Sequence, residues 1–141
     1  MIIRNRCKET FYKIYAKYKD DMWIHKGPNE DGFYSRILAR EVAVTREACD
    51  DPDDYDVFAF LHEVGHVLTN KPYQKRCLQE YLASQWALEE AKNFQFYVSD
   101  DIINHYQQYI WQWRETCIKQ KGKDVPTKEE LTLRRTQIIF T

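Results

Sequence analysis

The sequence predicts a single α+β domain that is mostly helical and carries a small antiparallel sheet of two or three strands before a central helix. Three observations support this fold class. Apolar residues recur at helical spacing through most of the chain, whereas β-forming residues cluster between about positions 22 and 46. The length of 141 residues suits one domain, residues 1–141, and is sufficient to bury a core without disulfides.

Charge and cysteine usage narrow the class of protein. With a formal net charge of −1, the chain lacks the overall excess of positive charge that is typical of nucleic-acid-binding domains. The cysteines lie far apart without a CxxC pair, which suits a reducing compartment (Cys7, Cys49, Cys77 and Cys117). The N-terminus has no apolar signal region, and no run approaches the length of a membrane span. We therefore expect a cytoplasmic protein that has neither a membrane nor a nucleic acid as partner.

The first part of the chain predicts an amphipathic helix and then the sheet. Residues from about 5 to 19 place large side chains on one buried face (Phe11, Ile14, Tyr15 and Tyr18). A short strand at about 22–25, a turn at 27–32 and strands at about 33–38 and 41–46 follow. Val42 and Val44 alternate with more polar positions, so this last strand should have one solvent-facing side. Its edge is a candidate site for an extended substrate that adds as a further strand.

A run of acidic residues predicts the start of the central helix. Asp50 or Asp51 can cap it, and Pro52 fits its first position. The helix then runs to about Asn70, because Pro72 cannot continue it. Its residues are apolar nearly all round, which predicts burial on almost every side (Val57, Phe58, Phe60, Leu61, Val64, Val67 and Leu68).

The second part of the chain predicts helices only. One runs from about residue 74 to 93, and another from about 102 to 121, capped by Ser99 or Asp100 and closed by Gly122. Thr127 and Glu130 have capping-box spacing, which predicts a short last helix. The tail from about residue 122 is expected to be peripheral. The helix predicted at about 102–121 carries one apolar stripe (Ile103, Tyr106, Ile110, Trp113 and Cys117).

The motif that carries chemistry is His62-Glu63-Val64-Gly65-His66 in the central helix. Histidines four residues apart share one helix face, where both imidazoles can bind a divalent metal, and the adjacent Glu63 can act as a general base on water. Unpaired polar side chains would be costly in so apolar a helix, and a metal explains their presence. Two hydrogen-bonded core histidines beside a solvated glutamate are the alternative interpretation.

Geometry indicates a third ligand. If the central helix and the next one form an antiparallel hairpin with its turn near Pro72, residues whose numbers sum to about 146 face each other. Glu80 then lies opposite His66, and Ser84 opposite His62. Small side chains on that face let the helices approach closely (Ala83, Ser84 and Ala87). Ligation by two histidines and one glutamate leaves the fourth position of a tetrahedral Zn²⁺ open, as catalysis requires.

The group that would stabilise an oxyanion is left open by the sequence. Five side chains are candidates, and none stands out (Tyr55, Tyr73, Tyr81, His105 and Tyr106).

The segment from His62 to His66, followed by Glu80-Tyr81-Leu82-Ala83-Ser84-Gln85-Trp86-Ala87, resembles the ImmA/IrrE-like zinc metallopeptidases of phages and mobile elements. Their motif is HExxH followed by Glu-x-x-Ala and an aromatic-Ala pair. The resemblance covers roughly residues 33–91. It implies a zincin-like, gluzincin-type fold, with His62, His66 and Glu80 as zinc ligands and Glu63 as catalytic base. It also implies a cytoplasmic endopeptidase with a protein substrate, such as a regulator or repressor.

The predicted function is therefore that of a zinc-dependent endopeptidase that hydrolyses a specific protein or peptide substrate. One alternative is a non-catalytic phage-type interaction or inhibitor protein that retains the zincin fold. Another is a zinc hydrolase acting on something other than peptides, since an open zinc site does not fix the substrate. Nucleic-acid binding through the basic first helix ranks last. The oligomeric state does not follow from the sequence.

Overall fold

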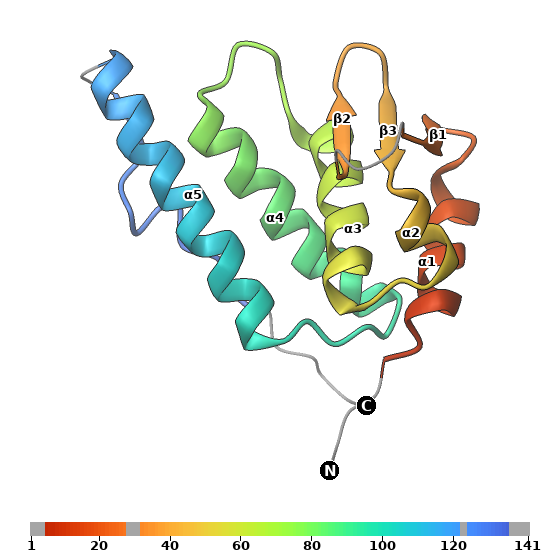
Figure 1. The fold of residues 1–141 in the computed structure, drawn as a ribbon. Coiled ribbons are helices and arrows are strands. Elements are labelled where there is room, and N and C mark those ends of the chain that lie inside the picture. Colours follow the sequence, from red (N-terminus) through yellow and green to blue (C-terminus); the bar gives the residue numbers. More distant parts are fainter. Residues whose placement is uncertain (1–4, 28–31, 122–123, 136–141) are drawn as a thin grey trace.

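The computed structural model describes residues 5–27, 32–121 and 124–135. In chain order, its elements are α1 (Cys7–Tyr18), β1 (Trp23–Lys26), β2 (Tyr34–Arg36), β3 (Glu41–Val44), α2 (Arg46–Asp50), α3 (Asp54–Thr69), α4 (Arg76–Asn93) and α5 (Asp100–Lys121). The fold is α+β and mostly helical, as predicted, with the sheet beside one end of the helices (Figure 1).

The sheet is mixed, and the prediction of an antiparallel sheet was wrong in this respect. Its strand order is β1-β3-β2, with β3 antiparallel to β2 but parallel to β1. The local alternation of residues identifies strands, but strand order depends on how the connecting segments cross, which a local pattern does not contain.

β3 is the central strand, and the predicted solvent-facing side of this strand is absent. All four of its residues are buried, including Glu41 at 6% exposure. Its inner side packs against the helices, while His25 and Arg36 from the neighbouring strands contact the Glu41 carboxylate on the outer side. Side chains from both neighbouring strands therefore cover the outer side of the middle strand.

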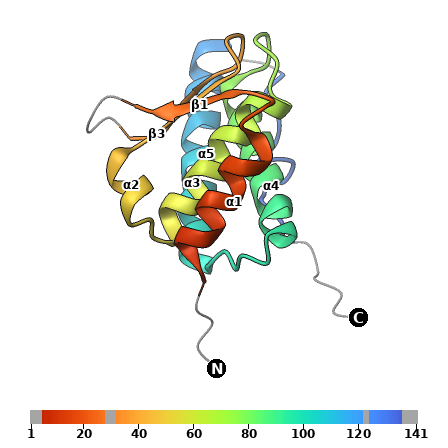
Figure 2. The ribbon, with the colours of Figure 1, turned by 90° about the vertical axis from the view of Figure 1, so that its right-hand side faces the viewer.

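α3 is the central helix of the domain. It packs against α1, α4, β2 and β3. Figure 1 shows it between α1 and α4, and Figure 2 shows α1 in front of it. Of the predicted buried residues, Val57, Phe58, Phe60, Leu61, Val64 and Val67 are in the core, whereas Leu68 is 40% exposed.

The start of α3 differs from the prediction. Its N-cap is Asp53, not Asp50 or Asp51, and Pro52 precedes the helix instead of opening it. Asp53 and Asp56 exchange side-chain to backbone hydrogen bonds of 2.8 and 3.0 Å, which satisfy two N–H groups at once. Asp50 is instead the last residue of α2, which Thr45 caps at its start, and Asp51 is the C-cap of that helix.

The other long helices follow their predicted courses, with one correction in α1. In α1, Phe11, Ile14 and Tyr18 are buried, but Tyr15 is 40% exposed. α5 begins at Asp100, and the predicted cap Ser99 precedes it, with its Oγ accepting a hydrogen bond from the backbone N–H of Ile102.

The predicted last helix is a single turn. Thr127 and Glu130 exchange the two hydrogen bonds of a capping box, yet the turn over 128–131 does not continue as a helix. Instead Gln107 of α5 bonds the backbone of Leu131 and Leu133, which docks this segment onto α5. Gly122, the predicted helix end, lies outside the described residues.

All four cysteines are free thiols. Burial, together with contact with Cys117, raises the pKa of the Cys77 thiol to about 11. Cys77 is therefore a neutral core residue near neutral pH and a poor candidate for a metal ligand. Within the described ranges, the structure contains no helix with the length and hydropathy needed to cross a membrane.

Candidate metal centre

His62 and His66 lie one turn apart on the face of α3 that packs against α4. Both are buried, at 4% and 6% exposure, and their Nε2 atoms are 3.0 Å apart. Both imidazoles turn Nε2 toward the same point, as two histidine ligands of one metal ion do.

Gly65 allows the two helices to approach each other at this point. A Cβ atom at this position would lie 2.7 Å from the carbonyl oxygen of Ala83 and 3.1 Å from its Cα. Ala83, Ser84 and Ala87 on α4 are completely buried, in agreement with the prediction of a close helix pair. The role of Gly65 was not predicted, although a glycine inside a buried helix is a signal of close packing.

Glu80 reaches the two histidines from α4. Its Oε2 lies 2.9 Å from Nε2 of His62 and 3.1 Å from Nε2 of His66, and the residue is 1% exposed. Ser84, one turn later, lies with its Oγ 3.0 Å from Nδ1 of His62. The hairpin register predicted from the sequence is confirmed, since both residues face their expected partners. Metal ligation by Glu80 stays a prediction.

The other ring nitrogens of the histidines have oxygen partners. Nδ1 of His66 contacts Oδ1 of Asn70, and Nδ1 of His62 contacts Ser84. The Asn70 amide is oriented by a 3.0 Å hydrogen bond from its Nδ2 to the carbonyl of Gln79, which leaves Oδ1 as the acceptor. When each Nδ1 donates its proton to oxygen, each Nε2 keeps a lone pair, which is the tautomer that a metal requires.

The distances fit a small tetrahedral ion. Three ligands at the usual zinc distances of about 2.0–2.1 Å would be roughly 3.3 Å from one another. The three atoms observed, two Nε2 and one Oε2, are 2.9–3.1 Å apart. A small outward movement of each side chain would admit the ion.

Glu63 also lies close to the histidines. The His62, Glu63 and His66 side chains form a group that could hold a metal ion, with one ligand atom from each within 4.8 Å of the others. Glu63 nevertheless differs from Glu80 in its contacts. Its Oε2 accepts a 2.9 Å hydrogen bond from Ser35 of β2, whereas Oε2 of Glu80 contacts both imidazoles. The contacts thus distinguish Glu80, which touches both imidazoles, from Glu63, which is hydrogen-bonded to the sheet.

Electrostatics couple Glu80 to the histidines. Burial alone would raise the pKa of the Glu80 carboxyl, but the hydrogen bonds from His62 and His66 outweigh it and hold this pKa far below its ordinary value. For His66, burial lowers the pKa, but the Glu80 carboxylate, the charge of Glu63 and the contact with Asn70 together raise it by more, so the net pKa is raised. Glu80 is thus an anion at neutral pH and available to a cation.

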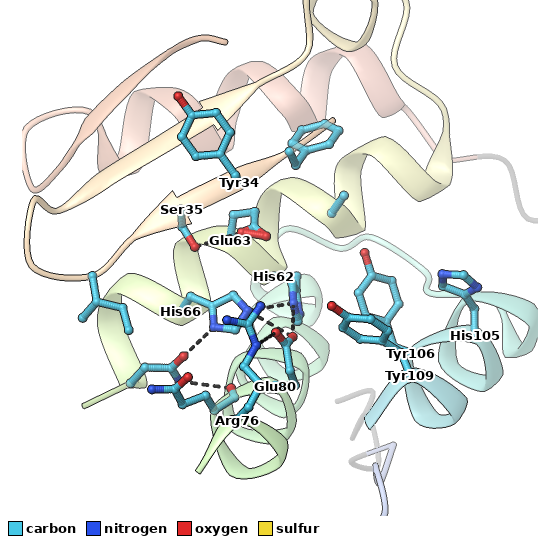
Figure 3. Close-up of a pocket in the computed structure, with 15 residues that line it drawn as sticks. Tyr34, Ser35, His62, Glu63, His66, Arg76, Glu80, His105, Tyr106 and Tyr109 are labelled. Carbon is cyan, nitrogen blue, oxygen red and sulfur yellow. Dashed lines mark hydrogen bonds and ion pairs between the residues drawn. The ribbon is translucent and has the colours of Figure 1, made fainter. Parts of the chain in front are cut away.

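The site opens into a cavity of about 400 Å³ between α3, α4, α5 and β2 (Figure 3). Of the five oxyanion candidates, His105 and Tyr106 line this cavity, whereas Tyr55, Tyr73 and Tyr81 do not. Burial, and then the charge of Glu63, raises the pKa of Tyr106, whose phenol therefore stays protonated. Several further residues line the cavity without any signal in the sequence that predicts this role (Phe33, Tyr34, Ser35, Ile37, Arg76 and Tyr109).

Comparisons with models of known protein families, with curated proteins and with solved structures find no match to this chain. Its function must therefore be argued from the site itself.

Proposed function

We propose that this protein is a zinc-dependent endopeptidase in which His62, His66 and Glu80 hold the metal and Glu63 is the general base. One observation carries the proposal: two Nε2 atoms and one carboxylate oxygen, all buried, are 2.9–3.1 Å from one another. Asn70 Oδ1 is placed to accept a hydrogen bond from Nδ1 of His66, and the Ser84 hydroxyl can accept one from Nδ1 of His62, so both Nε2 atoms can turn a lone pair to a metal. Two histidines and a carboxylate, with one position open, are the donor set of a catalytic zinc.

When bound, zinc supplies a Lewis acid that polarises a carbonyl group and lowers the pKa of water. Glu63 lies beside this position and can accept a proton from the attacking water and deliver it to the leaving amine. Ser35 donates a hydrogen bond to Oε2 of Glu63, which holds the carboxylate toward the cavity. His105 and Tyr106 remain the candidates for a donor to the developing oxyanion.

The sheet offers a place for an extended peptide, but not where the sequence suggested. β3, with Val42 and Val44, is paired on both sides and cannot accept another strand. β2 is an edge strand of the described sheet, and Tyr34 and Ser35 line the cavity. A substrate chain pairing with β2 would pass beside Glu63, and its backbone hydrogen bonds would hold it there.

Two features support a specific protein substrate. The cavity has walls on three helices and a strand, which favours selective binding over general digestion. The resemblance of the motifs to ImmA/IrrE-like peptidases, at His62 to His66 and Glu80 to Ala87, favours a regulator or repressor of the kind that phages and mobile elements encode.

The test uses protein purified without chelator. The wild type and the Glu63→Gln variant should both contain about one zinc per chain by elemental mass spectrometry, and only the wild type should produce new N-termini in a proteome. Glu89→Gln, at an exposed position of α4, is the matched control and should keep both properties. Wild-type protein without metal, or equal cleavage by wild type and Glu63→Gln, would contradict the proposal.

A further inference from the structure

Arg76 stands at the start of α4, one turn before Glu80, and lines the same cavity. Its Nε lies 2.8 Å from Oε1 of Glu80, so the oxygen that contacts the histidines, Oε2, is not used by this ion pair. The guanidinium also lies over the ring of Trp113 on α5, 5.0 Å from the ring centroid. Two contacts of different kinds therefore hold this group in place, and Figure 3 shows Arg76 beside Glu80 and the two histidines.

The terminal nitrogens of Arg76 are uncommitted. Within the described part of the chain, its polar contact is the ion pair of Nε with Glu80, and no residue there accepts a hydrogen bond from its two amino groups. The side chain is 49% exposed. A guanidinium presents its donors as a rigid planar fork whose spacing matches a carboxylate. The guanidinium of Arg76 is therefore held in place, and its two amino groups have no partner among the described residues and can bind a ligand.

The charges around the cavity also favour an anionic ligand. Glu63 and Glu80 are the carboxylates that line the cavity, and a divalent metal would balance the two of them. Arg76 then gives the site a net positive charge. The site is partly shielded from water, which strengthens its attraction for a negative group.

We propose that Arg76 binds a carboxylate of the substrate next to the cleaved bond. The carboxylate then belongs to an acidic side chain close to the cleavage position or, for a bond cleaved near the end of a chain, to the free C-terminus. This inference rests on the proposed zinc peptidase function. It differs from a role in which Arg76 only orients Glu80, because that role gives no preference between charged and neutral ligands.

The first test measures binding instead of turnover. The probes are succinic acid monohydroxamate, which has a zinc-binding group and a carboxylate, and its neutral counterpart in which an amide replaces the carboxylate. Calorimetry with the zinc-loaded wild type should show at least about tenfold tighter binding of the charged probe, as hydrogen bonds to charged groups give. Equal affinity of the two probes would overturn the inference.

Variants then assign the preference to Arg76. Arg76→Gln should bind both probes equally, while Arg76→Lys should keep part of the preference, because an ammonium attracts the carboxylate without the fork. Arg134→Gln, which changes an exposed arginine that does not line the cavity, is the control and should match the wild type. An undiminished preference in Arg76→Gln would also overturn the inference. The comparison of the charged and neutral probes on the wild type remains a test even if the Arg76→Gln variant loses zinc.

A second experiment distinguishes the two sources of the carboxylate. Peptides that differ only as Glu or Gln at one position, or as free or amidated C-termini, compete with a fluorescent hydroxamate for the zinc-loaded Glu63→Gln variant. One of these pairs should differ about tenfold, and no difference in either pair would overturn the inference. Absence of zinc from the wild type would instead refute the proposed function, so the two failures are separable.

Discussion

Two places in this molecule combine histidine, glutamate and arginine with almost the same contacts. In the sheet cluster (His25, Arg36 and Glu41), Nε2 of His25 lies 2.9 Å from one Glu41 oxygen, and Nε of Arg36 lies 3.4 Å from the other. In the helix cluster (His62, His66, Arg76 and Glu80), the corresponding contacts of Glu80 are 2.9 Å to His62 and 2.8 Å to Arg76. Both carboxylates are buried.

The surroundings separate the two clusters. His25 stacks on Trp23 at a ring distance of 4.0 Å, and its Nδ1 faces the carbonyl of Lys26 at 3.3 Å. No second imidazole joins it among the described residues. In the helix cluster, a second Nε2 lies 3.0 Å from the first, and a cavity opens beside both. The sheet cluster therefore has the contacts of an ion pair, whereas the two converging imidazoles beside a cavity form a group that could hold a metal ion.

The largest expected effect comes from removing a ligand. Glu80→Gln or His66→Ala should abolish stoichiometric zinc binding, because the remaining donors leave the ion incompletely held. Glu41→Gln, the same change in the sheet cluster, should leave zinc content unchanged. Elemental analysis of the three purified variants is the measurement. Loss of zinc from Glu41→Gln would contradict the distinction between the clusters.

The next effect concerns the approach of the helices. Gly65→Ala places a Cβ against the Ala83 backbone, which cannot move away as a flexible side chain would. We expect a loss of about 1–3 kcal/mol in the free energy of unfolding, together with weaker zinc binding, since Glu80 moves with α4. Denaturant unfolding and zinc titration measure both.

The matched control for that change is Gly27→Ala beside the sheet. The added Cβ there meets the Cβ of Ala43 at 3.2 Å, a contact that shifts of a few tenths of an ångström relieve. It should cost less than about 1 kcal/mol and leave zinc affinity unchanged. A Gly65→Ala variant as stable as Gly27→Ala would show that the helix contact is not tight.

A smaller effect is expected at the partners of the Nδ1 atoms. Asn70→Ala removes the acceptor of His66, so that the ring is no longer held in one tautomer. Zinc affinity should fall about 10–100-fold with zinc still bound at high concentration, as for other residues that support metal ligands. Competition with a chromophoric chelator measures this affinity. An affinity equal to that of the wild type would indicate that Asn70 serves only the end of α3.

The smallest effect is a dependence on pH. Without metal, the pKa of His66 is raised, so its contribution to stability is complete below the ordinary pKa of 6.5 and is lost as the pH rises through the raised value. Zinc should reverse this trend, because it binds histidines that have lost their protons. The rise in Tm on adding zinc should therefore grow between about pH 5.5 and 8. The same increment at every pH would contradict ligation by His66.

The sequence was sufficient for the parts of the site that follow from helix periodicity. His62 and His66 share a face because they are four residues apart, and the turn at Pro72 brings Glu80 opposite them. Both inferences need only the rise and turn of a helix and one reversal of the chain. The buried character of α3 follows from its own residues in the same way.

Only the tertiary structure determined the rest. Strand order, the burial of Glu41 and the contact of Ser35 with Glu63 depend on contacts between segments that are far apart in the chain. A local sequence pattern does not specify such contacts. Arg76 is close in sequence to Glu80, yet its place in the cavity also depends on Trp113 of α5. Periodicity specifies which side chains lie on the same face of a helix, whereas long-range packing decides which other residues contact that face.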